Sequence, residues 1–165
     1  MYFTKRKAQP TVKSPTDKPL PNKQPERTRH AFHVAHPLRH SHITSPFGWR
    51  TDMFTKKKAF YNGIDLRANY EPAYAMFPGK FIHIGRDHRA GLYLTLSHGS
   101  ITVIYCHLSK ILVPVSTAVR PGTPVAITCN TSRSTAPHLH LSVKVKGKLV
   151  NPNMLILNLD AQEPH

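Results

Sequence analysis

The stretch "PHLHLSVKVKGKLVNP", residues 137–152, alternates apolar and polar side chains almost without interruption. This alternation predicts β-strands, because successive side chains of a strand point to opposite faces. Gly147 interrupts the pattern and predicts a turn between two strands. His138 and His140 are therefore expected on one face of the first strand, and Leu139 on the other.

The same kind of signal continues through most of the chain. Residues 91–109, "GLYLTLSHGSITVIYCHLS", predict a hairpin that turns at residues 98–100. Shorter strands are expected within residues 43–50, 59–66, 72–86 and 119–128, and only residues 153–159 could form a helix turn. Strands at this spacing indicate one compact all-β domain.

Composition divides the chain into four parts. Residues 1–29 are rich in Pro and Lys and are predicted to be a disordered basic arm. Residues 30–42 form a histidine-rich lead-in, residues 43–158 the folded domain, and residues 159–165 a tail. The histidines of the lead-in are His30, His33, His36, His40 and His42.

The net charge of +15 favours polyanionic partners such as nucleic acid, anionic lipid or cell-wall polymers. Residues 1–40 hold nine Lys and Arg against two acidic residues, a net charge of +7. The remaining 125 residues carry the other +8, so the basic character also belongs to the folded domain.

No apolar run is long enough to span a bilayer, and the basic N-terminus lacks the apolar core of a secretory signal. We therefore expect a protein made in the cytoplasm that reaches the bacterial envelope by an unconventional route, such as lysis, a secretion machine or a phage particle. The two cysteines, Cys106 and Cys129, are predicted to be small buried thiols.

Polar residues within the predicted strands form a candidate metal site. In "IYCHLS", residues 104–109, alternation puts Tyr105 and His107 on one face and Cys106 on the apolar side. Together with His138 and His140, His107 makes a cluster of imidazoles, and zinc takes His nitrogens and Asp oxygens as ligands. The alternative for His138 and His140 alone is a pair of surface histidines on an exposed sheet face.

A series of motifs resembles one known family. The segments "ITSPFGWR", "YNGIDL", "SHG", "YCHLS", "RPGTPV" and "NTSRSTAPHLHLSVKVKGKLVNP" occur in this order between residues 43 and 153. The series is similar to the lysostaphin/LytM-type zinc endopeptidases, which cut peptidoglycan cross-bridges and stem peptides. The resemblance implies a mostly antiparallel, open-barrel sheet core and a zinc-dependent hydrolysis of peptide bonds without a protein nucleophile.

The resemblance also implies roles for single residues. Asp65 and His140 match the family's zinc ligands, and His107 and His138 match its catalytic pair. Tyr61 stands where the family has its first histidine ligand. The residues expected to line the substrate groove are Asn62, Arg133 and Ser134.

Three interpretations of Tyr61 are open. Tyr61 could bind zinc as a phenolate, although the pKa of tyrosine is normally near 10. A histidine of the lead-in could replace it. In the third interpretation the site binds metal weakly or not at all, and Tyr61 forms a hydrogen bond to Asp65.

Two other functions remain as alternatives. A degenerate member of the same fold could bind cell wall or regulate another hydrolase. A basic nucleic-acid-binding β-domain is suggested by charge alone, and nucleic acid is the less favoured partner. The expected partners are peptidoglycan peptides and anionic cell-wall polymers, and the expected state is a monomer.

Overall fold

The computed structural model describes residues 34–52, 55–129 and 137–160. The chain divides into two units, residues 1–30 and 31–165, and the described residues all lie in the second. The predicted basic arm, residues 1–29, and two histidines of the lead-in, His30 and His33, lie outside the described residues. So do Arg133, Ser134 and residues 161–165 of the predicted tail.

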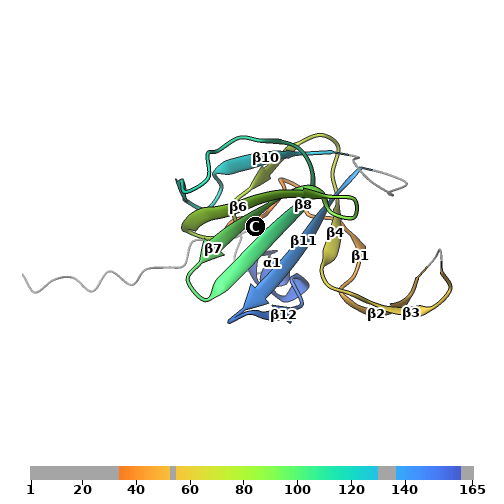
Figure 1. Ribbon diagram of the computed structural model, residues 1–165. Helices are drawn as coiled ribbons and strands as arrows, with labels where there is room; N and C mark the ends of the chain where they lie inside the picture. The colour runs from red at the N-terminus through yellow and green to blue at the C-terminus, as the bar shows by residue number, and fades with distance from the viewer. Residues whose placement is uncertain (1–33, 53–54, 130–136, 161–165) are drawn as a thin grey trace, which may run out of the picture. The chain divides into compact units, whose positions relative to one another are not determined.

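A ten-stranded sheet forms the body of the domain (Figure 1). Its strands are β1 (Ile43–Ser45), β4 (Ile64–Arg67), β5 (Pro72–Tyr74), β6 (Gly79–Asp87), β7 (Gly91–His98), β8 (Ile101–Ile111), β9 (Ala118–Val119), β10 (Pro124–Thr128), β11 (His138–Val145) and β12 (Lys148–Val150). The strand order is β1-β4-β11-β8-β7-β6-β9, while β10 pairs with β5 and β8, and β12 pairs with β11.

Every pairing between the described strands is antiparallel, which confirms the prediction of an all-β, mostly antiparallel fold. The helix α1 (Asn153–Asp160) forms where the sequence predicted only a helix turn. Within the part of the chain that the structure describes, no helix is long and apolar enough to cross a membrane.

Both predicted tight turns are present. β7 and β8 join through Gly99, whose φ is +69°, with His98 opposite Ile101. β11 and β12 join through Lys146 and Gly147, whose φ values are 48° and 79°. Positive φ at both central residues is the signature of the hairpin turn whose twist matches that of its flanking strands.

The central strand β11 separates the apolar core from a polar site. Leu139, Leu141 and Val143 are fully buried in the hydrophobic core, as alternation predicted. His140 and Ser142 alternate with them and are also buried, so the opposite face of β11 is covered as well. A covered polar face on a central strand is where charged and imidazole groups can interact strongly, because water is largely excluded.

Residues 34–42 pack onto the sheet. The Ala35 amide donates to the Met76 carbonyl at 2.8 Å, and the Tyr74 amide donates to the Pro37 carbonyl at 2.9 Å. Leu38 is 0% exposed and belongs to the core. This part of the histidine-rich segment is therefore structurally continuous with the sheet domain.

A separate two-stranded sheet of β2 (Gly48–Thr51) and β3 (Lys58–Tyr61) stands off the larger sheet (Figure 1). Its aromatic side chains are exposed, Trp49 to 74% and Phe60 to 43%. The two rings meet edge to face with centroids 5.5 Å apart. β3 ends at Tyr61, and only two residues separate it from β4.

We expect Leu38→Ala to lower the free energy of unfolding by about 2–5 kcal/mol, because it empties a fully buried position. Urea unfolding followed by circular dichroism measures this change. Leu149→Ala is the control, because Leu149 is 39% exposed and its truncation should cost far less. Equal, small effects of both substitutions would show that residues 34–42 contribute nothing to the core.

Candidate metal centre

Three neighbouring strands bring the candidate site residues together. β4, β11 and β8 lie side by side, and the register places His140 of β11 opposite Asp65 of β4. The same histidine lies opposite Cys106 of β8. Residues directly opposite in antiparallel strands share a face, so Asp65, His140 and Cys106 all point to the polar side of the sheet.

The face predicted for Cys106 is therefore wrong, and the reason is a local break in strand alternation. Tyr105, opposite Leu141, is fully buried in the apolar core. His107 adopts a φ of +60°, and the pairing of β8 with β7 shifts register in this region. Side chains alternate between the two faces only in a regular strand, and a bulge changes the direction of the side chain that follows it. His107 thus reaches the polar face although Cys106 already occupies it.

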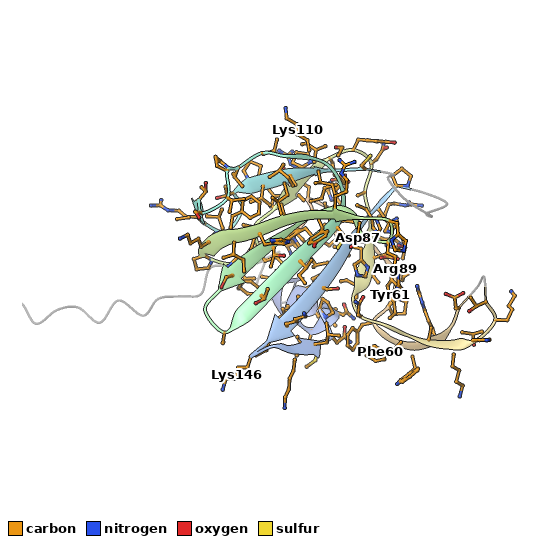
Figure 2. All side chains as sticks on the ribbon, viewed as in Figure 1. Phe60, Tyr61, Asp87, Arg89, Lys110 and Lys146 are labelled. Atoms are coloured by element: carbon orange, nitrogen blue, oxygen red, sulfur yellow. The ribbon has the colours of Figure 1, made fainter. Side chains whose placement is uncertain are left out.

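Three polar atoms form a tight triangle at the base of the β2–β3 hairpin. The Tyr61 hydroxyl donates a hydrogen bond to Asp65 Oδ1 at 2.5 Å. The Tyr61 oxygen lies 3.0 Å from His140 Nδ1, and His140 Nδ1 lies 3.0 Å from Asp65 Oδ1. Figure 2 shows Tyr61 where the hairpin meets the larger sheet. The carboxylate, imidazole and phenol thus converge on one point.

Ser142 determines which nitrogen of His140 carries a proton. The Ser142 hydroxyl donates its single proton to the Asn62 carbonyl at 3.0 Å. The Ser142 oxygen, 3.1 Å from His140 Nε2, therefore accepts from that nitrogen. Nε2 is protonated, and Nδ1 is the nitrogen directed at Asp65 and Tyr61.

The resulting arrangement calls for a positive charge beside Nδ1. The Tyr61 proton is used on Asp65, so a neutral His140 would direct its Nδ1 lone pair at two oxygens only 3.0 Å away. Acceptors at that distance repel one another unless a second ring proton or a metal cation lies between them. This donor set fits a zinc ion, because zinc takes carboxylate oxygen and imidazole nitrogen.

Tyr61 is the weakest donor of the three. Among residues 34–52, 55–129 and 137–160, no group of three His, Cys, Asp or Glu side chains could hold a metal ion, and the phenol of Tyr61 is the third polar group at this point. Neighbouring ligands of a tetrahedral zinc lie about 3.3 Å apart when the bonds are about 2.0–2.1 Å long. At 2.5 Å the Tyr61 oxygen and Asp65 Oδ1 lie closer together than two zinc ligands would, so they would separate in order to hold an ion.

Burial and hydrogen bonding move the pKa values of the two oxygen donors apart. Burial, followed by the hydrogen bond to Asp65, raises the pKa of Tyr61 far above its usual range. Burial also raises the pKa of Asp65, but the polar contact with His140 and the hydrogen bond from Tyr61 outweigh it, and the net shift is downward. Without a metal, the proton accordingly stays on Tyr61 and the negative charge on Asp65.

A pair of imidazoles lies next to the triangle. The rings of His107 and His138 have centroids 4.6 Å apart and planes tilted by 55°. His138 Nε2 is 3.8 Å from Asp65 Oδ1, and the His107 ring is 6.1 Å from that of His140. The structure therefore brings together all four residues that the sequence singled out.

Cys106 shares this face but is not poised to act as a nucleophile. Burial, and then the negative charges of Asp87 and Asp65, raise the pKa of its thiol to about 12. At neutral pH the thiol keeps its proton, and the thiolate is the reactive form of cysteine.

Sequence reasoning missed two residues that shape the site. Ser142 continues the period-two series of His138 and His140, so the alternation of β11 could have identified it. Gly63 is a packing requirement: a Cβ there would lie 2.4 Å from the Leu141 carbonyl oxygen and 2.8 Å from His140 Cε1. Only glycine lets the start of β4 approach β11 this closely.

Of the predicted groove residues, Asn62 lies at the site through its carbonyl, while Arg133 and Ser134 are outside the described residues. The lead-in histidines His36, His40 and His42 belong to no metal-binding group among the residues that the structure describes.

A buried carboxylate and clustered imidazoles on the polar face of an antiparallel sheet are groups suited to bind a metal ion. The sequence matches Peptidase family M23 over residues 59–152, more than half of the chain. The protein therefore belongs to peptidase family M23.

Known proteins resemble this chain to different extents. It is 36% identical to the peptidoglycan DD-endopeptidase ShyA of Vibrio cholerae over 99 residues, covering 59% of this chain and 23% of that protein. A zinc-containing peptidase from Vibrio cholerae superposes with a TM-score of 0.68 at 33% identity, covering 73% of this chain and 39% of that one. The catalytic domain of lysostaphin from Staphylococcus simulans superposes with a TM-score of 0.63 at 24% identity, over 71% of this chain and 92% of that one, and supports the fold.

The chain spans only between 23% and 29% of the length of the curated relatives it matches. The similarity therefore concerns this endopeptidase-like domain and not the whole of those larger proteins.

We expect Ser142→Ala to weaken zinc binding by about 10–100-fold, because it removes the group that fixes the His140 tautomer. Competition with a chromophoric chelator measures the affinity. Ser109→Ala is the matched control, since the Ser109 hydroxyl donates to the carbonyls of Ile127 and Thr128 and not to a proposed ligand. Unchanged zinc affinity in Ser142→Ala would show that His140 does not need this partner.

Proposed function

We propose that this domain is a zinc-dependent endopeptidase that hydrolyses cross-links or stem peptides of bacterial peptidoglycan. The observation that carries the proposal is the convergence of Asp65, His140 and the His107–His138 pair on one polar face. The similarity to a peptidoglycan DD-endopeptidase and to a zinc-containing peptidase supports both the substrate class and the metal.

Asp65 Oδ1, His140 Nδ1 and the Tyr61 oxygen would hold the zinc. When bound, zinc acts as a Lewis acid that polarises a peptide carbonyl and makes a water molecule more acidic. The low pKa of Asp65 keeps this ligand ionised at neutral pH. The Ser142 hydroxyl keeps the proton of His140 on the nitrogen that faces away from the ion.

His107 and His138 would carry the proton transfers. Their rings lie close together beside Asp65, on the same polar face as the proposed ligands. An imidazole that accepts a proton from the attacking water is a general base, and one that donates a hydrogen bond stabilises the oxyanion of the tetrahedral intermediate. Both functions need the ring nitrogens on the polar face, which the bulge at His107 provides.

A second candidate function is recognition of wall peptides without cleavage. The hydrogen bond from Tyr61 to Asp65 favours it, because a phenol that keeps its proton competes with a metal for the carboxylate. In that case the polar face serves as a binding site for peptide carbonyl and carboxylate groups.

The β2–β3 hairpin is the surface that we propose for anionic wall polymers. A groove of about 580 Å³ is lined there by Trp49, Arg50, Thr51 and Lys58. Two cationic side chains beside an exposed indole suit a polymer that carries both sugar rings and negative charges. Asn62, Arg133 and Ser134 are the residues that we propose to line the substrate groove.

We further propose that residues 43–158 form the peptidase domain, preceded by an arm (1–29) and a lead-in (30–42) and followed by a tail (159–165). The domain would act as a monomer at the cell envelope, where its substrate lies.

Four variants test the assigned roles by digestion of purified peptidoglycan and by zinc content. We expect Asp65→Ala and His140→Ala to lose both zinc and activity, because they remove the ligands. His107→Ala and His138→Ala should keep zinc and lose about 10²–10⁴-fold in turnover, because they remove proton transfer. His83→Ala, which changes an exposed histidine of β6, should match the parent.

The proposal fails if all four variants digest peptidoglycan as well as the parent. If the parent binds peptidoglycan but holds no zinc and releases no peptide, the recognition function holds instead.

A further inference from the structure

We propose that Arg50 is a positioning residue that holds the Tyr61 hydroxyl against Asp65 and His140, and so completes the three-donor triangle. The consequence for zinc rests on the proposed function, whereas the positioning itself does not. Nothing in the family resemblance assigns a role to an arginine at this place. The inference is carried by the packing of the β2–β3 hairpin around the Tyr61 ring.

The Arg50 guanidinium lies over the face of the Tyr61 ring, 3.6 Å from its centroid. The Tyr61 ring also packs edge to face against the His140 ring, with centroids 5.1 Å apart. Tyr61 is therefore held on its face by Arg50, on its edge by His140, and at its hydroxyl by Asp65. Of these three partners, only Arg50 comes from outside the triangle.

The strand register explains why Arg50 has this role. Tyr61 lies directly opposite Gly48, which offers no side chain to pack against the ring. Arg50 is two residues farther along β2, so it shares a face with Gly48 and is the diagonal neighbour of Tyr61. Diagonal pairs are within reach of aromatic and long side chains, so the arginine takes the place that a cross-strand side chain would fill.

The chemistry of the pair suits a metal site that uses a phenol. A tyrosine oxygen that faces a cation carries more negative charge than a neutral imidazole does. Arginine stays positively charged under all relevant conditions and binds aromatic faces through its planar guanidinium. Histidine is shorter than tyrosine, is neutral as a ligand and presents a smaller ring. A histidine at position 61 would therefore not depend on Arg50.

The test is a double-mutant cycle on zinc affinity, measured by chelator competition on the full chain. We expect Arg50→Ala to weaken zinc binding by about 10–100-fold, the range for residues that orient a ligand. Tyr61→His should bind zinc more tightly than the parent, and adding Arg50→Ala to Tyr61→His should leave that affinity unchanged. Lys58→Ala, which removes one positive charge from the same hairpin groove, is the matched control.

The inference is overturned if Arg50→Ala weakens zinc binding equally in the parent and in Tyr61→His. It is also overturned if Lys58→Ala weakens zinc binding as much as Arg50→Ala does. In either case the effect would be one of charge and not of position. No effect of Arg50→Ala in the Tyr61 background would overturn it as well.

A second measurement separates this inference from the proposed function. A metal-free crystal structure of Arg50→Ala should show the Tyr61 hydroxyl displaced from Asp65. If the hydroxyl stays in place, Arg50 is not a positioning residue, whatever the zinc affinities are. If the parent takes up no zinc while the Tyr61 hydroxyl moves as expected, the zinc-dependent function fails and the role of Arg50 stands.

Discussion

The site depends on one close approach between strands, the 3.0 Å separation of Asp65 Oδ1 and His140 Nδ1 across the β4–β11 pair. Cross-strand register fixes this distance, and the Ser142 hydroxyl directs the unprotonated nitrogen of His140 toward the carboxylate. Two acceptors held so close attract a cation, which supports the metal site proposed for this face. The backbone allows the approach because Gly63 has no side chain to separate the strands.

The pairing of His107 with His138 depends on an irregularity in an otherwise regular sheet. His107 reaches the polar face only because its backbone adopts a positive φ, which is uncommon for a residue with a Cβ. Such strain persists when the surrounding structure enforces it, and here the amide of His107 donates to the Ala90 carbonyl while its own carbonyl accepts from Cys129. The ladder of β8 is thus interrupted at the residue whose side chain has to change direction.

Tyr61, the last residue of β3, connects the hairpin to the polar site on the larger sheet. The Tyr61 side chain is longer than that of histidine, and its hydroxyl donates its proton to Asp65 within the triangle. The guanidinium of Arg50, from the neighbouring strand, lies over the Tyr61 ring. The arrangement links the affinity of the site for a metal to the packing of a small exposed sheet. That sheet also carries the aromatic and basic groups proposed to meet the cell wall, so Arg50 belongs both to the proposed binding groove and to the surroundings of the site.

The sequence by itself determined the strand-rich fold, the turns at Gly99 and Gly147 and the shared face of His138 and His140, because all of these follow from local alternation and turn chemistry. It also singled out Asp65 and His107 through motif resemblance. Only the tertiary structure decided that Cys106 faces the site and Tyr105 the core, since a bulge cancels alternation. The tautomer of His140 and the contact of Arg50 with Tyr61 were likewise beyond the sequence, because both depend on which residues strand register places opposite one another.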